Sequence, residues 1–171
     1  MNRAEHEEPV LIREATAGDI SALARLHVQT FRETHGGGPP CEVREEQYRH
    51  KFAATDGGWF CFVGARPDGE LVGFAIGEPY TGDGYGGRLN KLYLLRQYHR
   101  LGLGRMLVGH VVRRFLDRGV TSMLLFSEAD NPSIGFFEAL GGARLLSETG
   151  EFHGGYGWQD LTTLAARCPT A

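Results

Sequence analysis

The sequence predicts a single α/β domain of the α+β kind, with helices on both faces of a mixed sheet. Three observations lead to this fold class. The first half of the chain contains a β-hairpin, and a strand, a helix and a further strand follow between residues 89 and 127, as expected of a parallel pair. The 171 residues are 42% hydrophobic, enough for one substantial core. The glycines gather in segments 36–38, 82–87 and 154–157, which we interpret as loops.

The first half of the chain is predicted to form a strand, two helices and a hairpin. Residues 10–15 are strand-like, and residues 16–19 approximate a capping box before a helix with one apolar face. A second helix covers 43–54. The runs 59–65 and 70–78 are rich in aromatic and β-branched residues, and the turn-forming residues between them predict a hairpin.

The middle of the chain is predicted to alternate between strand and helix. A strand over 89–95 precedes a long helix that starts after Gly102, carries a broad apolar stripe and stops at Gly119. The next strand covers 121–127. This strand, helix and strand form the unit that we expect to contain the parallel pair.

A short helix and two strands complete the predicted sheet. Asn131 is a favourable N-cap with Pro132 at the first helical position, and the glycine pair at 141–142 ends that helix. Strands are expected over 143–148 and 156–164.

These elements predict one domain over residues 10–166, between a flexible N-terminal segment, 1–9, and a tail, 167–171. The net charge of −3 argues against a nucleic-acid-binding protein, which normally carries clustered excess Lys and Arg. Three scattered cysteines suit neither a disulfide framework nor a zinc site, and no apolar run is long enough to cross a bilayer. We therefore expect a cytoplasmic protein with no metal, membrane or nucleic-acid partner.

Residues 89–107 are the most informative part of the sequence, because a strand leads through a basic glycine turn into a helix. Gly102 and Gly104 let the main chain approach a ligand, and the first amides of the helix have no partner within it. Such amides suit phosphate oxygens, and Arg100 and Arg105 can add charge-assisted hydrogen bonds. The turn predicts a site for a cofactor that carries a diphosphate.

Two other phosphate-binding motifs fit the spacing less well. In the dinucleotide fingerprint Gly-x-Gly-x-x-Gly, the third glycine would fall on Leu107. In the loop of nucleoside triphosphate hydrolases a lysine follows a glycine, and neither Lys51 nor Lys91, the only lysines of the sequence, does so. A Rossmann-type nucleotide-binding protein stays open as a less favoured alternative, and ATP hydrolysis is not expected.

Residues 99–104, with the sequence HRLGLG, resemble the Gln/Arg-x-x-Gly-x-Gly/Ala loop of the GNAT acyl-CoA N-acyltransferases, with His99 where that family usually has Gln or Arg. Segments 12–15 and 92–94 resemble the family's opening and fourth strands. Residues 131–141 resemble its Asn-Pro-x-x-x-Phe-Tyr-Glu-x-Leu-Gly segment, and Tyr156-Gly157-Trp158 extends the likeness toward the end of the chain. The similarity spans nearly the whole predicted domain.

The resemblance implies a twisted sheet that splays between its fourth and fifth strands, with acetyl-CoA in the splay. It also implies an N-acetyltransferase that needs no metal, in which the primary amine of a small molecule or peptide attacks the thioester directly. The family often forms dimers, so the resemblance allows a homodimer. The residues implied in cofactor binding are Leu92, Tyr93, Leu94, His99, Arg100, Leu101, Gly102, Leu103, Gly104, Arg105, Asn131 and Phe137.

The resemblance also implies an oxyanion donor, a backbone amide at Leu94 or nearby, and leaves the acid open. Relatives commonly place a tyrosine where this chain has Phe137, which has no proton to give. Tyr93, Tyr156 and His35 are the substitutes that we consider for protonating the leaving thiolate. Because the usual acid is missing, a non-catalytic acyl-CoA-binding regulator is our second hypothesis.

Glu128 is the candidate catalytic base. It follows the predicted strand 121–127 beside the expected splay, and it can accept the proton of the amine, directly or through water, if partial burial favours its neutral form. Glu33 and Asp83 are further acidic residues that could bind a cationic substrate.

Overall fold

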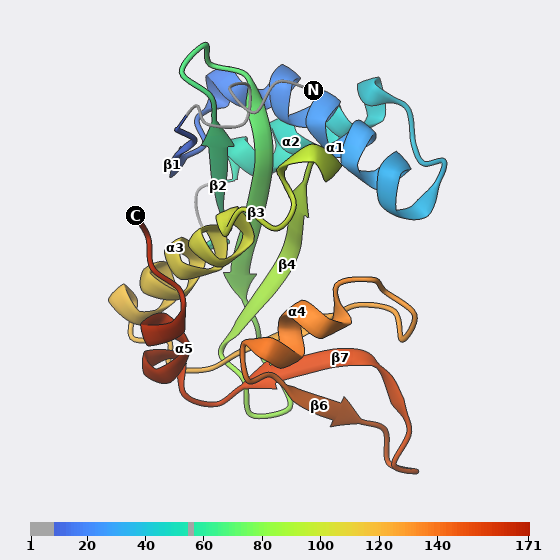
Figure 1. The fold of residues 1–171 in the computed structure, drawn as a ribbon, viewed down its shortest axis with the longest axis vertical. Coiled ribbons are helices and arrows are strands. Elements are labelled where there is room, and N and C mark those ends of the chain that lie inside the picture. The colour runs from blue at the N-terminus through green and yellow to red at the C-terminus, as the bar shows by residue number, and fades with distance from the viewer. Residues whose placement is uncertain (1–8, 55–56) are drawn as a thin grey trace.

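The computed structural model describes residues 9–54 and 57–171, and these ranges contain one seven-stranded mixed sheet (Figure 1). The strand order is β1-β2-β3-β4-β5-β7-β6, and only β4 and β5 pair in parallel. The predicted fold class is confirmed, whereas the expected segment 1–9 lies outside the described residues except for Pro9. The strands are β1 (Leu11–Glu14), β2 (Phe60–Ala65), β3 (Leu71–Pro79), β4 (Gly87–Leu94), β5 (Met123–Phe126), β6 (Ala143–Leu146) and β7 (Phe152–Trp158).

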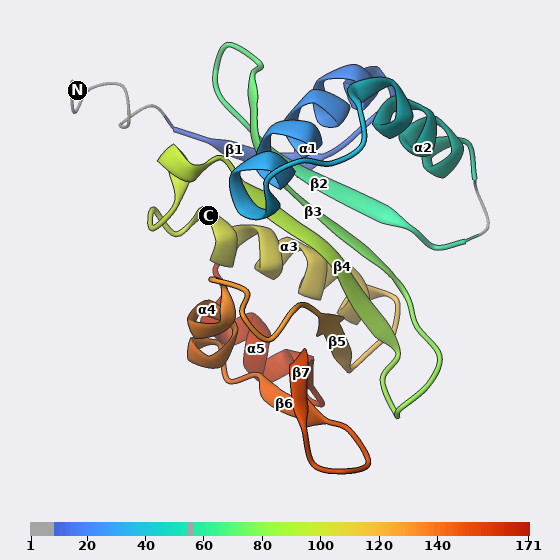
Figure 2. The ribbon, with the colours of Figure 1, turned by 90° about the vertical axis from the view of Figure 1, so that its right-hand side faces the viewer.

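Helices cover both faces of the sheet, as predicted. Figure 2 shows the first two helices on one side of β2, β3 and β4, and the long third helix on the other side. The last two helices contribute buried residues to the core on the side of the third helix. The helices are α1 (Ile20–His35), α2 (Cys41–Ala53), α3 (Leu103–Asp117), α4 (Ile134–Ala139) and α5 (Leu161–Arg167), with 3-10 turns η2 (Ala17–Asp19) and η3 (Arg96–Tyr98).

The start of α1 is fixed by the predicted capping residues. The carboxylate of Asp19 accepts a hydrogen bond from the Thr16 amide at 2.8 Å and binds the Arg13 guanidinium at 2.7 Å. The hydrogen bonds from Arg13 lower the pKa of Asp19 to about 2, against the opposing effect of its partial burial. Because Arg13 lies in β1, this contact attaches the first turn of the helix to the edge of the sheet.

The C-terminal end of the chain differs from the prediction. The strand expected over 156–164 ends at Trp158, and α5 follows because the Asp160 side chain accepts a hydrogen bond from the Thr162 amide and caps the helix. The expected tail from residue 167 begins inside α5, and Cys168 is fully buried against Gly109 of α3. The folded core therefore continues past residue 166 to Cys168.

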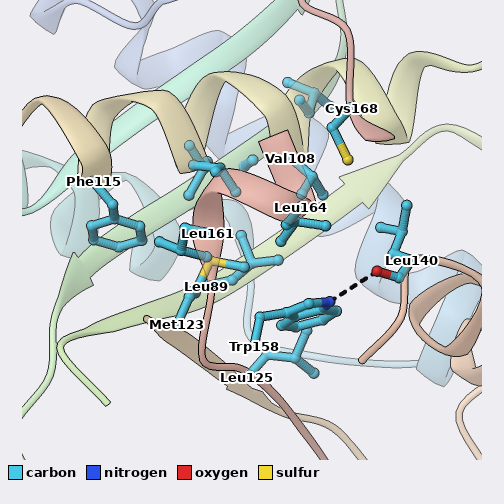
Figure 3. Packing of buried hydrophobic residues seen from close by; sticks show 14 of the residues in the cluster. Leu89, Val108, Phe115, Met123, Leu125, Leu140, Trp158, Leu161, Leu164 and Cys168 are labelled. Atoms are coloured by element: carbon cyan, nitrogen blue, oxygen red, sulfur yellow. Dashed lines mark hydrogen bonds between the residues drawn. The ribbon is translucent and has the colours of Figure 1, made fainter. Parts of the chain in front are cut away.

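Figure 3 shows side chains of the core between α3, α5 and the sheet. Phe115 of α3 and Leu161 of α5 pack there with Met123 of β5, all almost inaccessible to solvent. Trp158 closes this core, and its Nε1–H donates a hydrogen bond of 3.1 Å to the Leu140 carbonyl. The indole thus holds the end of α4 against the last strand.

The sheet splays between β4 and β5. The two strands pair only at Gly87 with Met123 and at Arg88 with Leu124, although β4 continues to Leu94. The stretch from Leu89 to Leu94 has no neighbour in the sheet on its β5 side, which confirms the splay that the resemblance implied. An open strand edge of this kind offers main-chain donors and acceptors to an extended ligand.

Candidate cofactor and acceptor site

The alternation of main-chain groups along β4 decides which residues face the splay. The Leu95 amide donates to the Val72 carbonyl at 2.9 Å, and Leu94 is paired with Gly73 in the adjoining register position. In an antiparallel ladder, the main-chain groups of successive residues point in alternate directions. The amides of Leu94 and Leu92 therefore point away from β3, toward the splay, and the amide of Tyr93 points toward β3. The main chain of Tyr93 therefore faces β3 rather than the splay in which the cofactor is expected, whereas Leu92 and Leu94 are suitably oriented.

The loop that follows β4 turns through two left-handed residues. Arg100 has φ of +65° and Gly102, the N-cap of α3, has φ of +83°. The first amide of α3 with a helical partner is that of Met106, which donates to the Gly102 carbonyl at 3.2 Å. Among the described residues, the amides of Leu103, Gly104 and Arg105 have no hydrogen-bond acceptor, and they form the free helix N-terminus that the sequence predicts.

Gly104 lies where the loop, β4 and α4 meet. A Cβ atom at this position would lie 3.4 Å from the Phe136 ring and 3.6 Å from Leu94, so the small residue keeps the three elements close. Leu103 is buried and anchors the helix start, while Arg100 and Arg105 are exposed and form no ion pair within the described ranges. Free amides and two exposed guanidinium groups together make a site suited to a diphosphate.

His99 has a different contact from the one expected. Its Nε2 donates a hydrogen bond of 2.9 Å to the Leu94 carbonyl, so the ring closes the loop onto the end of β4. The other ring nitrogen of a neutral imidazole has no hydrogen, and only the protonated ring could also donate to a phosphate. The predicted phosphate contact of His99 is thus restricted to its charged form.

The segment around α4 also differs from expectation. Phe137 is buried and packs against the Tyr156 ring, with centroids 5.8 Å apart, while the neighbouring Phe136 lies over Gly104. Successive helix residues point about 100° apart, so Phe136 rather than Phe137 faces the loop. Asn131 does not begin the regular helix, which starts at Ile134, but its Oδ1 accepts from the Ser133 amide at 2.8 Å and orders the approach to α4.

The expected proton-transfer groups have different surroundings. Glu128 lies two residues beyond β5 and is exposed, so the partial burial that its role as a base required is not observed. The Tyr156 hydroxyl donates to the Glu138 carboxylate at 2.8 Å, which removes it as a free acid. Tyr93 and His35 lie near each other, with Oη 3.4 Å from Nε2, on the side of the sheet that α1 covers.

A β-bulge in β4 brings together polar residues that the sequence did not predict as a site. Ile76 of β3 pairs with Lys91 and Gly77 pairs with Leu89, so Asn90 is the extra residue. The Asn90 side chain donates to the Glu78 carboxylate at 2.5 Å. Apolar residues three apart, Leu89 and Leu92, both reach the α3-side core, and this break in the usual alternation is the sequence signal that would have revealed the bulge.

The first helix is attached to the loop by an arginine. The amide of Arg96 donates to the Glu33 carboxylate and its guanidinium donates to the Glu33 carbonyl, each at 2.8 Å. One oxygen of the Glu33 carboxylate is thereby used to hold the start of the loop, and its binding of a cationic substrate stays a prediction. Earlier in α1, Nδ1 of His27 lies 2.8 Å from the hydroxyl of Tyr48 in α2, inside the core between α1, α2 and the sheet.

A sequence model of the Acetyltransferase (GNAT) family matches residues 20–142, well over half of the chain. This chain belongs to the GNAT acetyltransferase family. A relative, the uncharacterized N-acetyltransferase YuaI of Bacillus subtilis (strain 168), is 31% identical over 169 residues that cover 91% of this chain and 96% of YuaI.

Solved structures of other acetyltransferases have the same fold. The PaiA N-acetyltransferase of Thermoplasma acidophilum in complex with coenzyme A has a TM-score of 0.66 at 17% identity, covering 87% of this chain and 98% of its own. The aminoglycoside acetyltransferase AAC(6')-Ib in complex with coenzyme A has a TM-score of 0.69 at 21% identity, covering 92% and 98%. A GNAT acetyltransferase of Staphylococcus aureus Mu50 reaches 0.73 at 12% identity, covering 90% and 99%. At these identities the likeness concerns the fold alone.

No three His, Cys, Asp or Glu side chains in residues 9–54 and 57–171 gather in a way that could hold a metal ion. In the same ranges, no helix combines the length and the apolar character needed to span a membrane.

Proposed function

We propose that this GNAT acetyltransferase transfers the acetyl group of acetyl-CoA to the primary amine of a small molecule or peptide. The observation that carries the proposal is the set of free main-chain amides at the start of α3. They lie next to a strand edge whose Leu92 and Leu94 amides face an open splay. When bound, acetyl-CoA supplies an acetyl group already activated as a thioester. Family membership supports the same cofactor, since members of this fold have been solved with coenzyme A.

The residues fit the separate parts of this cofactor. The amides of Leu103, Gly104 and Arg105, with the guanidinium groups of Arg100 and Arg105, would hold the diphosphate. The amides of Leu92 and Leu94 would pair with the pantetheine arm as a neighbouring strand does. Whichever of these amides lies nearest the carbonyl oxygen would stabilise the negative charge that develops there.

The inner end of the splay is where we place the acceptor amine. The splay closes at Gly87 and Arg88, so the bulge at Asn90 and the facing Glu78 lie at this end. We assign to Glu78 the role of accepting the proton of the amine, directly or through water, in place of the exposed Glu128. The Asn90 amide group holds the Glu78 carboxylate in position.

The proposal includes a cytoplasmic location and the absence of a metal cofactor. Direct attack of an amine on a thioester needs a base and an oxyanion donor rather than a metal. Cys41, Cys61 and Cys168 are all free thiols, which supports a reducing compartment. A homodimer, and the lack of nucleic-acid partners, remain predictions.

A thermal-shift titration with acetyl-CoA, CoA and NADH, followed by a thiol-release assay with a panel of amines, tests the proposal. Selective binding to the folded state stabilises it by about 2.7 kcal/mol at a hundredfold excess over Kd. We expect stabilisation by both CoA species and amine-dependent thiol release. Stabilisation by NADH alone would favour the nucleotide-binding alternative. Binding of acetyl-CoA without thiol release for any amine would favour a regulator, which the missing tyrosine at Phe137 first suggested.

A further inference from the structure

Three basic side chains gather on the side of β4 that α1 and α2 cover, and we call Arg44, Arg88 and Lys91 the basic cluster. Arg88 and Lys91 are three residues apart and would point to opposite faces of a regular strand. The bulge at Asn90 corrects this spacing, because Arg88 pairs with Glu78 and Lys91 pairs with Ile76, two β3 residues on the same face. Ile76 belongs to the core between the sheet and α1, so Arg88 and Lys91 face that side, where Arg44 of α2 also lies against Phe31 of α1.

The structure leaves the charge of the basic cluster largely uncompensated. The Nε atoms of Arg44 and Arg88 are buried and have no hydrogen-bond partner. Lys91 is partly buried, and it forms no ion pair or hydrogen bond with any residue that the structure describes. Arg88 approaches Glu78 only at 4.0 Å, the limit of an ion pair, and Glu78 already accepts a hydrogen bond from Asn90. Native proteins rarely bury such donors unpaired.

The remaining contacts of the basic cluster are with neutral groups. Arg44 donates to the Gln47 side chain at 3.1 Å and lies 5.4 Å from the centre of the Phe31 ring. Arg88 lies 5.2 Å from the centre of the Phe126 ring, which is half exposed. These rings fix the guanidinium groups in place without neutralising them. Elsewhere on α2 acids are used for pairing, because Arg49 binds both Glu45 and Glu46.

The electrostatic effects on neighbouring groups show that the charges of the basic cluster act on one another. Burial lowers the pKa of Lys91, and the charges of Arg44 and Arg88 lower it further, with Lys51 adding a smaller effect and Glu78 alone opposing them. Burial also lowers the pKa of His27, and Arg44 and Lys91 contribute in the same direction. Several partly buried cations facing one carboxylate are costly unless an anion joins them.

We propose that the acetyl acceptor carries an anionic group, a carboxylate or a phosphate, which the basic cluster binds while Glu78 receives the proton of the amine. The inference rests on the proposed function, because it assigns the substrate class of the same site. The position agrees with this role, since Arg88 marks the point where the splay closes and Lys91 directly follows the bulge. An acceptor with an amine and an anion would reach both Glu78 and the basic cluster.

Matched amines test the anion site. At saturating acetyl-CoA, thiol release is measured with O-phosphoethanolamine against ethanolamine, and with β-alanine against β-alaninamide. We expect kcat/KM to be about tenfold or more higher for the anionic member of at least one pair, as charge-assisted hydrogen bonds predict. The pair that shows the preference distinguishes phosphate from carboxylate.

Variants distinguish a binding role from a structural one. In Lys91→Met and Arg44→Gln, we expect the ratio of kcat/KM for the anionic amine to kcat/KM for the neutral amine to fall about tenfold. The matched control is Arg49→Gln, an exposed and paired arginine of α2, which should keep the preference. Equal losses for both members of a pair would indicate a structural role and overturn the anion site.

The outcomes for the two proposals are separable. If acetyl-CoA stabilises the protein and neutral amines are acetylated as well as anionic ones, or no anionic amine is acetylated, the anion site is wrong. If acetyl-CoA and CoA fail to stabilise the protein, the proposed function itself is wrong.

Discussion

The two sides of β4 form their sites in different ways. On the α3 side, the loop 99–105 and the open strand edge offer main-chain amides, positioned by a left-handed Arg100 and by two glycines. On the α1 and α2 side, Glu78 and the basic cluster offer side chains, positioned by a bulge. Added bulk at the amides should disturb the first site most, whereas loss of a charged or proton-accepting side chain should disturb the second site most. Substitutions on each side should therefore have different signatures.

The largest effect that we expect concerns acid stability on the α1 and α2 side. Burial, reinforced by Arg44 and Lys91, lowers the pKa of His27 to about 3 from its ordinary 6.5. Between these values the unfolded chain binds a proton that the folded chain does not, so stability present above pH 6.5 is lost as the pH falls toward 3. The expected loss is roughly 5 kcal/mol. Urea unfolding across this range measures it.

A substitution isolates the contribution of His27. The variant His27→Phe should flatten the dependence of the unfolding free energy on pH, even if it lowers stability at pH 7 by removing the partner of the Tyr48 hydroxyl. His50→Phe, at an exposed position of α2, serves as the control and should keep the wild-type slope. Identical slopes for wild type and His27→Phe would show that His27 titrates normally.

The second largest effect that we expect comes from a bulky side chain at the start of α3. Gly104→Val adds a branched side chain 3.4 Å from Phe136 at the free amides, so we expect acetyl-CoA affinity to fall about a hundredfold or more, or about 2.7 kcal/mol. Calorimetric titration measures the change. Gly57→Val is the control, because a Cβ there meets no atom within 4 Å. Unchanged affinity in Gly104→Val would place the diphosphate elsewhere.

The third effect tests side-chain chemistry at the splay. Glu78→Gln keeps the shape of the group that binds Asn90 but cannot accept a proton, so we expect kcat to fall about a hundredfold. The stabilisation by acetyl-CoA should stay as in wild type, because Glu78 pairs with Arg88 near the start of β4, whereas the loop follows the other end of that strand. Glu128→Gln, on an exposed residue, should retain most of the activity. A fall in kcat for Glu128→Gln with no fall for Glu78→Gln would show that Glu128, not Glu78, accepts the proton.

The smallest effect concerns the stability of the unliganded protein. Because burial and neighbouring cations lower the pKa of Lys91, its charged form destabilises the fold below that pKa, and wild-type stability rises as the pH approaches 10.5. Lys91→Met removes this charge, so we expect Tm at pH 7 to rise by about 2 to 4 °C. A lower Tm in Lys91→Met would show that an unseen partner compensates the charge.

The difference between the two sides also explains what the sequence could predict. Glycine spacing, apolar periodicity and capping residues are local, and they predicted the loop and most of the elements, whereas the splay was implied by the family resemblance. The bulge at Asn90 depends on pairing with β3, and its local signal, the break in apolar alternation between Leu89 and Leu92, is a single irregularity within one strand. His99 contacts Leu94, and Phe136 rather than Phe137 contacts Gly104 of the loop. Both contacts depend on how the chain folds, so local patterns did not predict them.

The end of the chain shows a related limit. Residues after Trp158 continue the composition of a strand, yet Asp160 caps a helix that packs on α3 and buries Cys168. Tertiary packing of that apolar face decides between strand and helix there. Local propensity alone therefore placed the end of the last strand incorrectly.

The most direct test of the central claim is a crystal structure of the protein with coenzyme A. We expect the diphosphate oxygens within hydrogen-bonding distance of the Leu103, Gly104 and Arg105 amides, and the pantetheine paired with Leu92 and Leu94. A diphosphate bound elsewhere, or those amides occupied by other groups of the protein, would contradict the account.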